Sequence, residues 1–170
     1  MPTPQEDLRY LQASFPALKN YLLSDHLYYP LDGKLPRLTI GGILLSQQRL
    51  GDSATAARVN QNLSAFKSSW RAAWIRKSAR ELKARLRLWR NYLNDYNRNP
   101  EEYASDYAHE IRWRVMIELL SAETDKIPAE IAVLDQLLRA KFISGDFIWD
   151  ENLKSRFLED EFWFLYGKLR

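Results

Sequence analysis

The fold of this chain is decided by residues 82–96, which read LKARLRLWRNYLNDY. Apolar side chains recur there at steps of four and three residues, and this spacing places them on one face of an α-helix. The apolar positions are Leu82, Leu86, Trp89, Leu93 and Tyr96. Most of the other positions are charged or polar, so the stretch predicts an amphipathic helix whose apolar face packs against the rest of the chain.

A second apolar stripe precedes this one, at Ala56, Val59, Leu63, Phe66, Trp70 and Trp74. At 100° per residue the two stripes lie roughly 100° apart around a common helix. The first stripe gives way to the second near a polar run, in which Ser78 and Glu81 have the spacing of a capping box. Two alternatives stay open. The helix breaks near residue 77, or a continuous helix over 53–97, about 68 Å long at 1.5 Å per residue, protrudes to meet a partner.

The composition leaves helices as the main element of the fold. Among 170 residues there are only 6 glycines and 7 prolines, which argues against disorder and against turn-dense β structure. No alternating stretch is long enough to build a sheet. We therefore predict one all-α domain over residues 1–170, an irregular bundle of about five to six helices. Outside 53–97, helices and shorter helical pieces are expected at residues 4–23, 40–50, 100–122, 128–142, 151–157 and 159–168.

Two segments lack a regular helical stripe. Residues 26–37 contain two prolines and the turn signal Asp32-Gly33, and they are longer than an ordinary connection between helices. They predict a structured loop that folds back on the body. The C-terminal tail is rich in aromatic residues, which supply large buried surfaces to irregular segments and so predict a buried clamp. These residues are Phe142, Phe147, Trp149, Phe157, Phe162, Trp163, Phe164 and Tyr166.

Several classes of chemistry are excluded by what the chain lacks. It has no cysteine, and disulfides, thiolate zinc sites, iron–sulfur clusters and cysteine nucleophiles all require one. It contains no glycine-rich phosphate loop and no dinucleotide-binding fingerprint. No apolar run approaches the roughly 18 residues of a membrane span, and the N-terminus does not resemble a secretion signal. We expect a cytoplasmic protein that uses no cofactor and does not bind membranes.

The strongest local charge signal is the basic segment 71–90, which carries a net charge of +7. Basic side chains interleaved with tryptophans are typical of proteins that neutralise phosphates and stack on bases. The alternative is internal pairing, because residues 1–99 carry a net charge of +9 and residues 100–170 a net charge of −6. The candidate nucleic-acid-binding residues are Arg76, Lys77, Arg80, Lys83, Arg87 and Arg90.

A carboxylate and a histidine with metal-ligand spacing occur at Asp106 and His109. Helical bundles present metal ligands in this way, but the symmetric di-metal site needs the pair twice, and the only other histidine is His26. A mononuclear site that adds His26 or a carboxylate from residues 159–161 stays open. The alternative is an acid-rich helix start that faces solvent.

The helix expected at 100–122 is apolar on two sides. One side carries Ile111, Val115, Leu119 and Ala122, and the other carries the candidate interface residues Trp113, Met116 and Leu120. Such a helix is either the central helix of the domain or meets a second chain with one side.

These patterns favour a non-enzymatic role. The first hypothesis is a helical protein-protein interaction module whose partner is another protein or a second copy of the chain, as in a homodimer. The alternative is a nucleic-acid-binding helical protein that uses the basic segment 71–90. A second alternative is a metal-assisted enzyme at Asp106 and His109. The sequence indicates no catalytic residue and no cofactor-binding residue.

Overall fold

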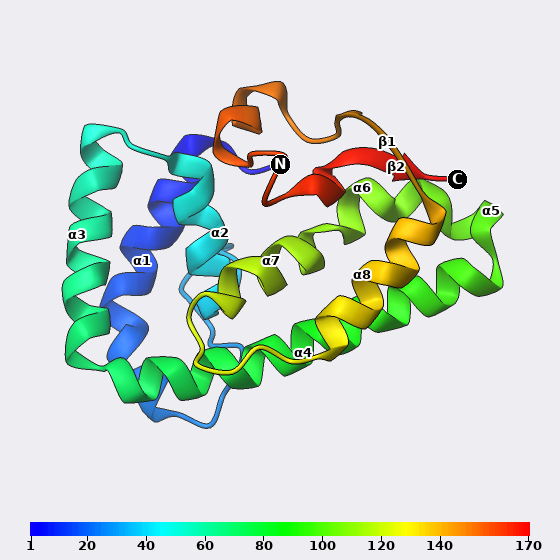
Figure 1. Ribbon diagram of the computed structural model, residues 1–170. Coiled ribbons are helices and arrows are strands. Elements are labelled where there is room, and N and C mark those ends of the chain that lie inside the picture. The colour runs from blue at the N-terminus through cyan, green and yellow to red at the C-terminus, as the bar shows by residue number, and fades with distance from the viewer.

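The computed structural model describes residues 1–170 and is mainly helical, as predicted (Figure 1). It contains eight α-helices rather than five or six, together with short 3₁₀ helices (η) and two short strands. In chain order the elements are α1 (Pro4–Leu23), α2 (Ile40–Leu50), α3 (Ala54–Ser69), α4 (Arg71–Arg98), α5 (Pro100–Tyr103), η1 (Ala104–Asp106), α6 (Tyr107–Glu110), α7 (Arg112–Ser121), α8 (Glu130–Lys141), β1 (Phe142–Phe147), η2 (Glu151–Arg156), η3 (Trp163–Leu165) and β2 (Tyr166–Leu169).

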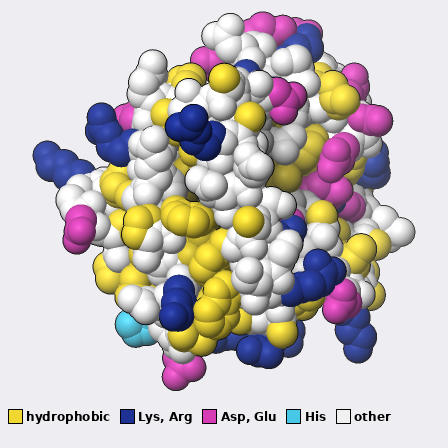
Figure 2. Space-filling model, turned by 90° about the vertical axis from the view of Figure 1, so that its left-hand side faces the viewer, with side chains coloured by type: hydrophobic (Ala, Val, Ile, Leu, Met, Phe, Trp, Pro, Cys, Tyr) yellow, Lys and Arg dark blue, Asp and Glu magenta, His cyan; other side chains and the backbone are white.

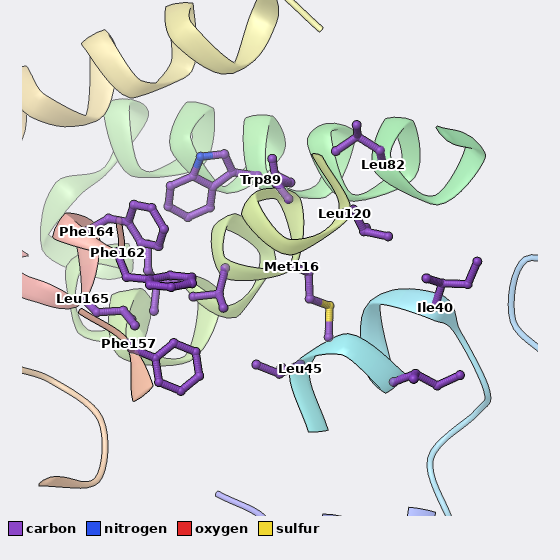
Figure 3. Close-up of a cluster of buried hydrophobic side chains, with 14 of the residues drawn as sticks. Ile40, Leu45, Leu82, Trp89, Met116, Leu120, Phe157, Phe162, Phe164 and Leu165 are labelled. Carbon is purple, nitrogen blue, oxygen red and sulfur yellow. The ribbon is translucent and has the colours of Figure 1, made fainter. Parts of the chain in front are cut away.

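The long helix α4 carries the core, because the whole apolar stripe that predicted it is buried. Leu82 and Trp89 of α4 lie beside Met116 and Leu120 of α7, and Ile40 and Leu45 of α2 lie next to that contact (Figure 3). All the buried apolar side chains of the chain belong to one cluster. The expected helices at 4–23 and 40–50 are both present, and Pro16 does not interrupt the first.

A break does divide residues 53–97, but it comes at Trp70 rather than near residue 77, and the alternative of a continuous helix was wrong. Trp70 leaves the helical conformation, with φ −119° and ψ 30°, and α4 starts at the next residue. Trp74 lies eight residues before Leu82 and therefore belongs to the stripe of α4 rather than to the earlier one. A corner between the two helices lets both stripes face the same core.

Helix α3 is attached to the body by few buried side chains, only Ala56 and Leu63. An aromatic row connects it to α1, because the ring centroids of Phe15 and Phe66 lie 6.1 Å apart and those of Phe66 and Trp70 lie 6.3 Å apart. Figure 2 views the molecule from this side and shows apolar side chains gathered in the lower half of the face, next to basic ones.

The helix expected at 100–122 is divided into α5, η1, α6 and α7. Two tyrosine hydroxyls bind backbone carbonyls at this segment and at the tail. Tyr92 donates to the oxygen of Tyr103 at 3.0 Å, and Tyr107 donates to that of Phe164 at 2.6 Å. These bonds fix the irregular segment against α4 and against the C-terminal tail.

The expectation that no sheet forms was wrong. β1 and β2 pair antiparallel in the register Phe142 to Leu169 and Ser144 to Gly167, with a bulge before Phe147. Gly167 has φ +155°, and a Cβ there would collide with the carbonyl oxygen of Ile143, so only glycine fits. The aromatic tail is a buried clamp as predicted, with Phe147, Phe157, Phe162, Phe164 and Tyr166 all buried.

None of the helices is both long enough and apolar enough to span a membrane.

Candidate functional site

A pocket of about 970 Å³ opens between five parts of the chain. The N-terminal end of α1, the loop before α2, and α2 itself form three of its walls. Arg85 of α4 and the segment from His109 to Met116 complete it. We call it the Arg85 pocket.

At the start of α2, two glycines let the helix backbone lie close to the side chains of Glu81 and Tyr10. The N–H of Gly41 donates to Oε2 of Glu81 at 2.8 Å, and that of Gly42 donates to Oγ1 of Thr39 at 2.8 Å. A Cβ on Gly41 would collide with the Glu81 carboxylate, and one on Gly42 would come 2.5 Å from the Tyr10 hydroxyl. The first donors of α2 are therefore already bound within the protein, with Glu81 acting as an N-terminal anion.

The expected capping box of Ser78 and Glu81 was wrong, because both residues lie buried in the middle of α4. Glu81 satisfies the start of α2 instead of the start of its own helix. Its other oxygen, Oε1, is buried and has no hydrogen-bond partner. Burial raises the pKa of Glu81 above the usual carboxyl value, and Arg85 and the Gly41 N–H partly oppose that shift.

Arg85 forms the floor of the pocket and is only 5% exposed. Its Nε donates to Glu81 at 3.3 Å and its Nη2 to Oγ1 of Thr39 at 3.4 Å. The guanidinium lies 5.3 Å from the ring centroid of Tyr28 and 4.9 Å from that of Trp113. Its Nη1 makes no hydrogen bond within the chain. One nitrogen of a buried cation therefore remains available to a ligand in the pocket.

The charges around the pocket are mainly positive. The lining includes six basic side chains against three acidic ones, Glu6, Asp7 and Asp32. Asp7 is already neutralised, because Arg49 binds both its oxygens at 2.7–3.2 Å. Arg112 lies 4.1 Å over the ring of Trp113, and burial lowers its pKa. The basic residues are Arg9, Lys34, Arg37, Arg49, Arg85 and Arg112, so the pocket has a surplus of positive charge that favours anions.

The basic segment 71–90 does not form one surface. Nζ of Lys77 donates to the carbonyls of Ser24 and His26 at 2.7 Å each, and it lies 4.6 Å from the ring centroid of Tyr21. Arg80 donates to the carbonyl of Asp25 at 3.0 Å. These two cations therefore fix the turn that follows α1.

The other candidates of this segment are divided between one ion pair and open solvent. Arg90 pairs with Glu130 at 2.6 Å, and it alone among the six candidates binds an acid of the C-terminal half. Arg76, Lys83 and Arg87 are exposed and have no acidic partner.

The candidate metal ligands lie near one another but lack further partners. Asp106 is exposed in η1 and His109 is exposed in α6. His109 contacts Arg112, and its Nε2 lies 3.9 Å from the Glu110 carboxylate. No group of three or more His, Asp or Glu residues in the chain could hold a metal ion. His109 instead stands at the edge of the Arg85 pocket.

The candidate interface residues lie within the molecule. Met116 and Leu120 are buried between α7, α4 and α2, and both are drawn in Figure 3. Trp113 is partly buried beside Arg85 and Arg112. The chain itself therefore covers this side of α7, because α2 packs on it.

Sequence reasoning counted Arg85 in the basic segment but did not single it out. A local signal was present, because Glu81 is the only acid within residues 71–90 and stands four residues before Arg85. The chain matches no protein-family model, no curated protein and no solved structure, so its function has to be argued from this site.

Proposed function

We propose that this protein is a non-enzymatic binding module that takes up a small anionic ligand in the Arg85 pocket. One observation carries the proposal. Arg85 is buried beside two aromatic rings, and its Nη1 has no partner in the chain and lines an open pocket. A bound anion would give this donor a charge-assisted hydrogen bond, which is stronger than a hydrogen bond to water.

The surroundings of Arg85 support an anion rather than a neutral ligand. Glu81 pairs with Arg85 at 3.3 Å, but burial raises the pKa of Glu81 and so disfavours its charged form. The rings of Tyr28 and Trp113 lie beside the guanidinium and reduce its contact with water. Electrostatic attraction is stronger in such a partly desolvated pocket than in bulk water.

The test is the change in melting temperature caused by small anions and by neutral analogues of the same shape. A ligand at a hundred times its Kd stabilises the folded state by about 2.7 kcal/mol, and we expect anions alone to give shifts of that kind. Arg85→Met should abolish the shift. Arg58→Met is the control, because Arg58 is an exposed arginine of α3 that lies outside the pocket. Equal shifts with neutral analogues, or an unchanged response of Arg85→Met, would contradict the proposal.

A second candidate function is binding of a protein partner or a second copy of the chain at α8. Val133 and Leu137, one turn apart, are 56% and 47% exposed, and Ile127 and Ile143 on either side of the helix are 66% and 42% exposed. Exposed apolar residues in a row mark interaction surfaces more often than scattered ones do.

We also propose, from the sequence alone, that the protein works in the cytoplasm.

Light scattering at high micromolar concentration tests the self-association form of this second candidate. A dimer that Leu137→Glu dissociates would support it. Leu158→Glu is the matched control, because Leu158 is similarly exposed, at 58%, but is not part of α8. A strict monomer would exclude the homodimer.

A further inference from the structure

The Arg85 pocket contains unused hydrogen-bond donors. Ser46 is only 2% exposed, lines the pocket and makes no side-chain hydrogen bond within the chain. The hydroxyl of Thr39 accepts from Gly42 and from Arg85. Ser46 of α2 and Nη1 of Arg85 in α4 therefore both offer donors to the pocket.

Arg112 adds a second guanidinium that no carboxylate neutralises. It lies 4.1 Å over the ring of Trp113, and the guanidinium of Arg85 lies 4.9 Å from the centroid of the same ring. Trp113 therefore holds two cations beside one pocket. Planar guanidinium groups bind the oxygens of carboxylates and phosphates in pairs.

The number of hydrogen-bond donors and the surplus of positive charge favour a phosphate group over a carboxylate as the ligand. A carboxylate has two oxygens and one negative charge, whereas a phosphomonoester presents three terminal oxygens and a charge of about −1.5 to −2 at neutral pH. A carboxylate would leave donors of this partly dry pocket without partners, which costs binding free energy. The acids on the lining do not reverse the balance, because five basic and two acidic side chains remain when the Asp7–Arg49 pair is set aside.

Part of the wall is apolar and fits an organic body. Tyr28, Leu35, Leu45, Trp113 and Met116 line it. The pocket volume of about 970 Å³ lies within the range of small-molecule sites. Inorganic phosphate alone would leave this apolar surface uncovered.

We infer that the Arg85 pocket binds a small phosphomonoester, with its phosphoryl group on Arg85, Arg112 and Ser46 and its organic body on the apolar part of the wall. This inference rests on the proposed function, since it names the class of anion. It does not use the N-terminus of α2, whose first N–H groups are bound to Glu81 and Thr39.

Isothermal titration with three probes tests the inference: phenyl phosphate, benzoate and inorganic phosphate. We expect phenyl phosphate to bind at least tenfold more tightly than either of the other two. Arg112→Gln should weaken phenyl phosphate at least tenfold and benzoate less. This variant should fold, because Arg112 has no ion pair to lose; Arg58→Gln serves as the control and should leave all three affinities unchanged.

The outcomes separate the inference from the proposed function. Benzoate binding as tightly as phenyl phosphate, with dependence on Arg85, would overturn the phosphomonoester and leave the anion pocket standing. No binding of any probe would overturn both. A 5′-phosphorylated oligonucleotide that bound far more tightly than phenyl phosphate and depended on Arg112 would overturn the small-molecule ligand in favour of nucleic acid.

Discussion

Two buried arginines of this protein have opposite environments. Arg114 of α7 donates to both oxygens of Asp135 at 2.8 and 2.9 Å and to Glu118 at 2.8 Å, so all three of its nitrogens are used. Arg85 of α4 makes two long hydrogen bonds and leaves its Nη1 free. The first arginine ties α7 to α8 in the folded chain, whereas the second faces a pocket. Burial alone does not distinguish a structural cation from a binding one; the count of satisfied donors does.

The largest effect is expected from Arg114→Met. Removing this cation leaves Asp135 and Glu118 together without a counter-charge, and the loss of unfolding free energy should be about 3 kcal/mol. Urea denaturation measures it, with Arg58→Met as the control. Anion binding by any remaining folded protein should be unchanged. A loss below about 1 kcal/mol would show that Arg114 is less important to the fold than its hydrogen bonds indicate.

Arg85→Met should be less destabilising, by about 2 kcal/mol at neutral pH, because the bonds it loses are longer. Glu81 keeps the N–H of Gly41 and can also take up a proton. The loss should therefore shrink as the pH is lowered toward 5, and denaturation at several pH values measures this. A loss equal to that of Arg114→Met at every pH would remove the contrast between the two arginines.

Glu81→Gln should change stability by less than about 1 kcal/mol at neutral pH, because the amide oxygen can still accept from Gly41. Burial raises the pKa of Glu81 above its usual value of 4.5. The folded state thus holds its proton more tightly than the unfolded state does. The stability of the original chain relative to Glu81→Gln should be greatest below pH 4.5 and fall as the pH rises through the raised pKa. Parallel pH profiles would contradict this assignment.

The smallest effect is expected from Arg90→Gln, which tests a third, exposed arginine. Its partner is Glu130, and the two side chains are 42% and 35% exposed. Solvent screens such pairs, so the change in unfolding free energy should stay within about 0.5 kcal/mol. Denaturation in low and high salt checks it. A larger loss would mean that α8 depends on this pair for its attachment to α4.

The elements that could be predicted are those with local signals. The stripe from Leu82 to Tyr96 predicted α4, and the helix expected at 40–50 is α2, because local signals lie within a few residues of the structure they specify. The corner at Trp70 has no glycine or proline to mark it. The strands were missed because Phe142 pairs with Leu169 across an intervening 3₁₀ segment, and a four-residue strand shows no period.

The site was harder to predict than the fold because its parts come from distant segments. Tyr28, Thr39, Arg85 and Trp113 belong respectively to a loop, the N-cap of α2, α4 and α7. The sequence shows each of these residues but does not show that they meet at one pocket in the folded chain. The proposed metal pair at Asp106 and His109 was visible because its two residues are neighbours on the chain, yet the structure brings no further ligand to them.

Two tyrosine hydroxyls hold the C-terminal tail against the body of the protein. Tyr96 donates to the carbonyl of Arg170 at 3.0 Å, and Tyr107 donates to that of Phe164. Phe162, Phe164 and Leu165 also complete the core against helices synthesised much earlier. Without residues 162–170 in place, part of α4 and α6 is therefore uncovered. We expect the helices to form first and this tail to seal the core in the last step of folding.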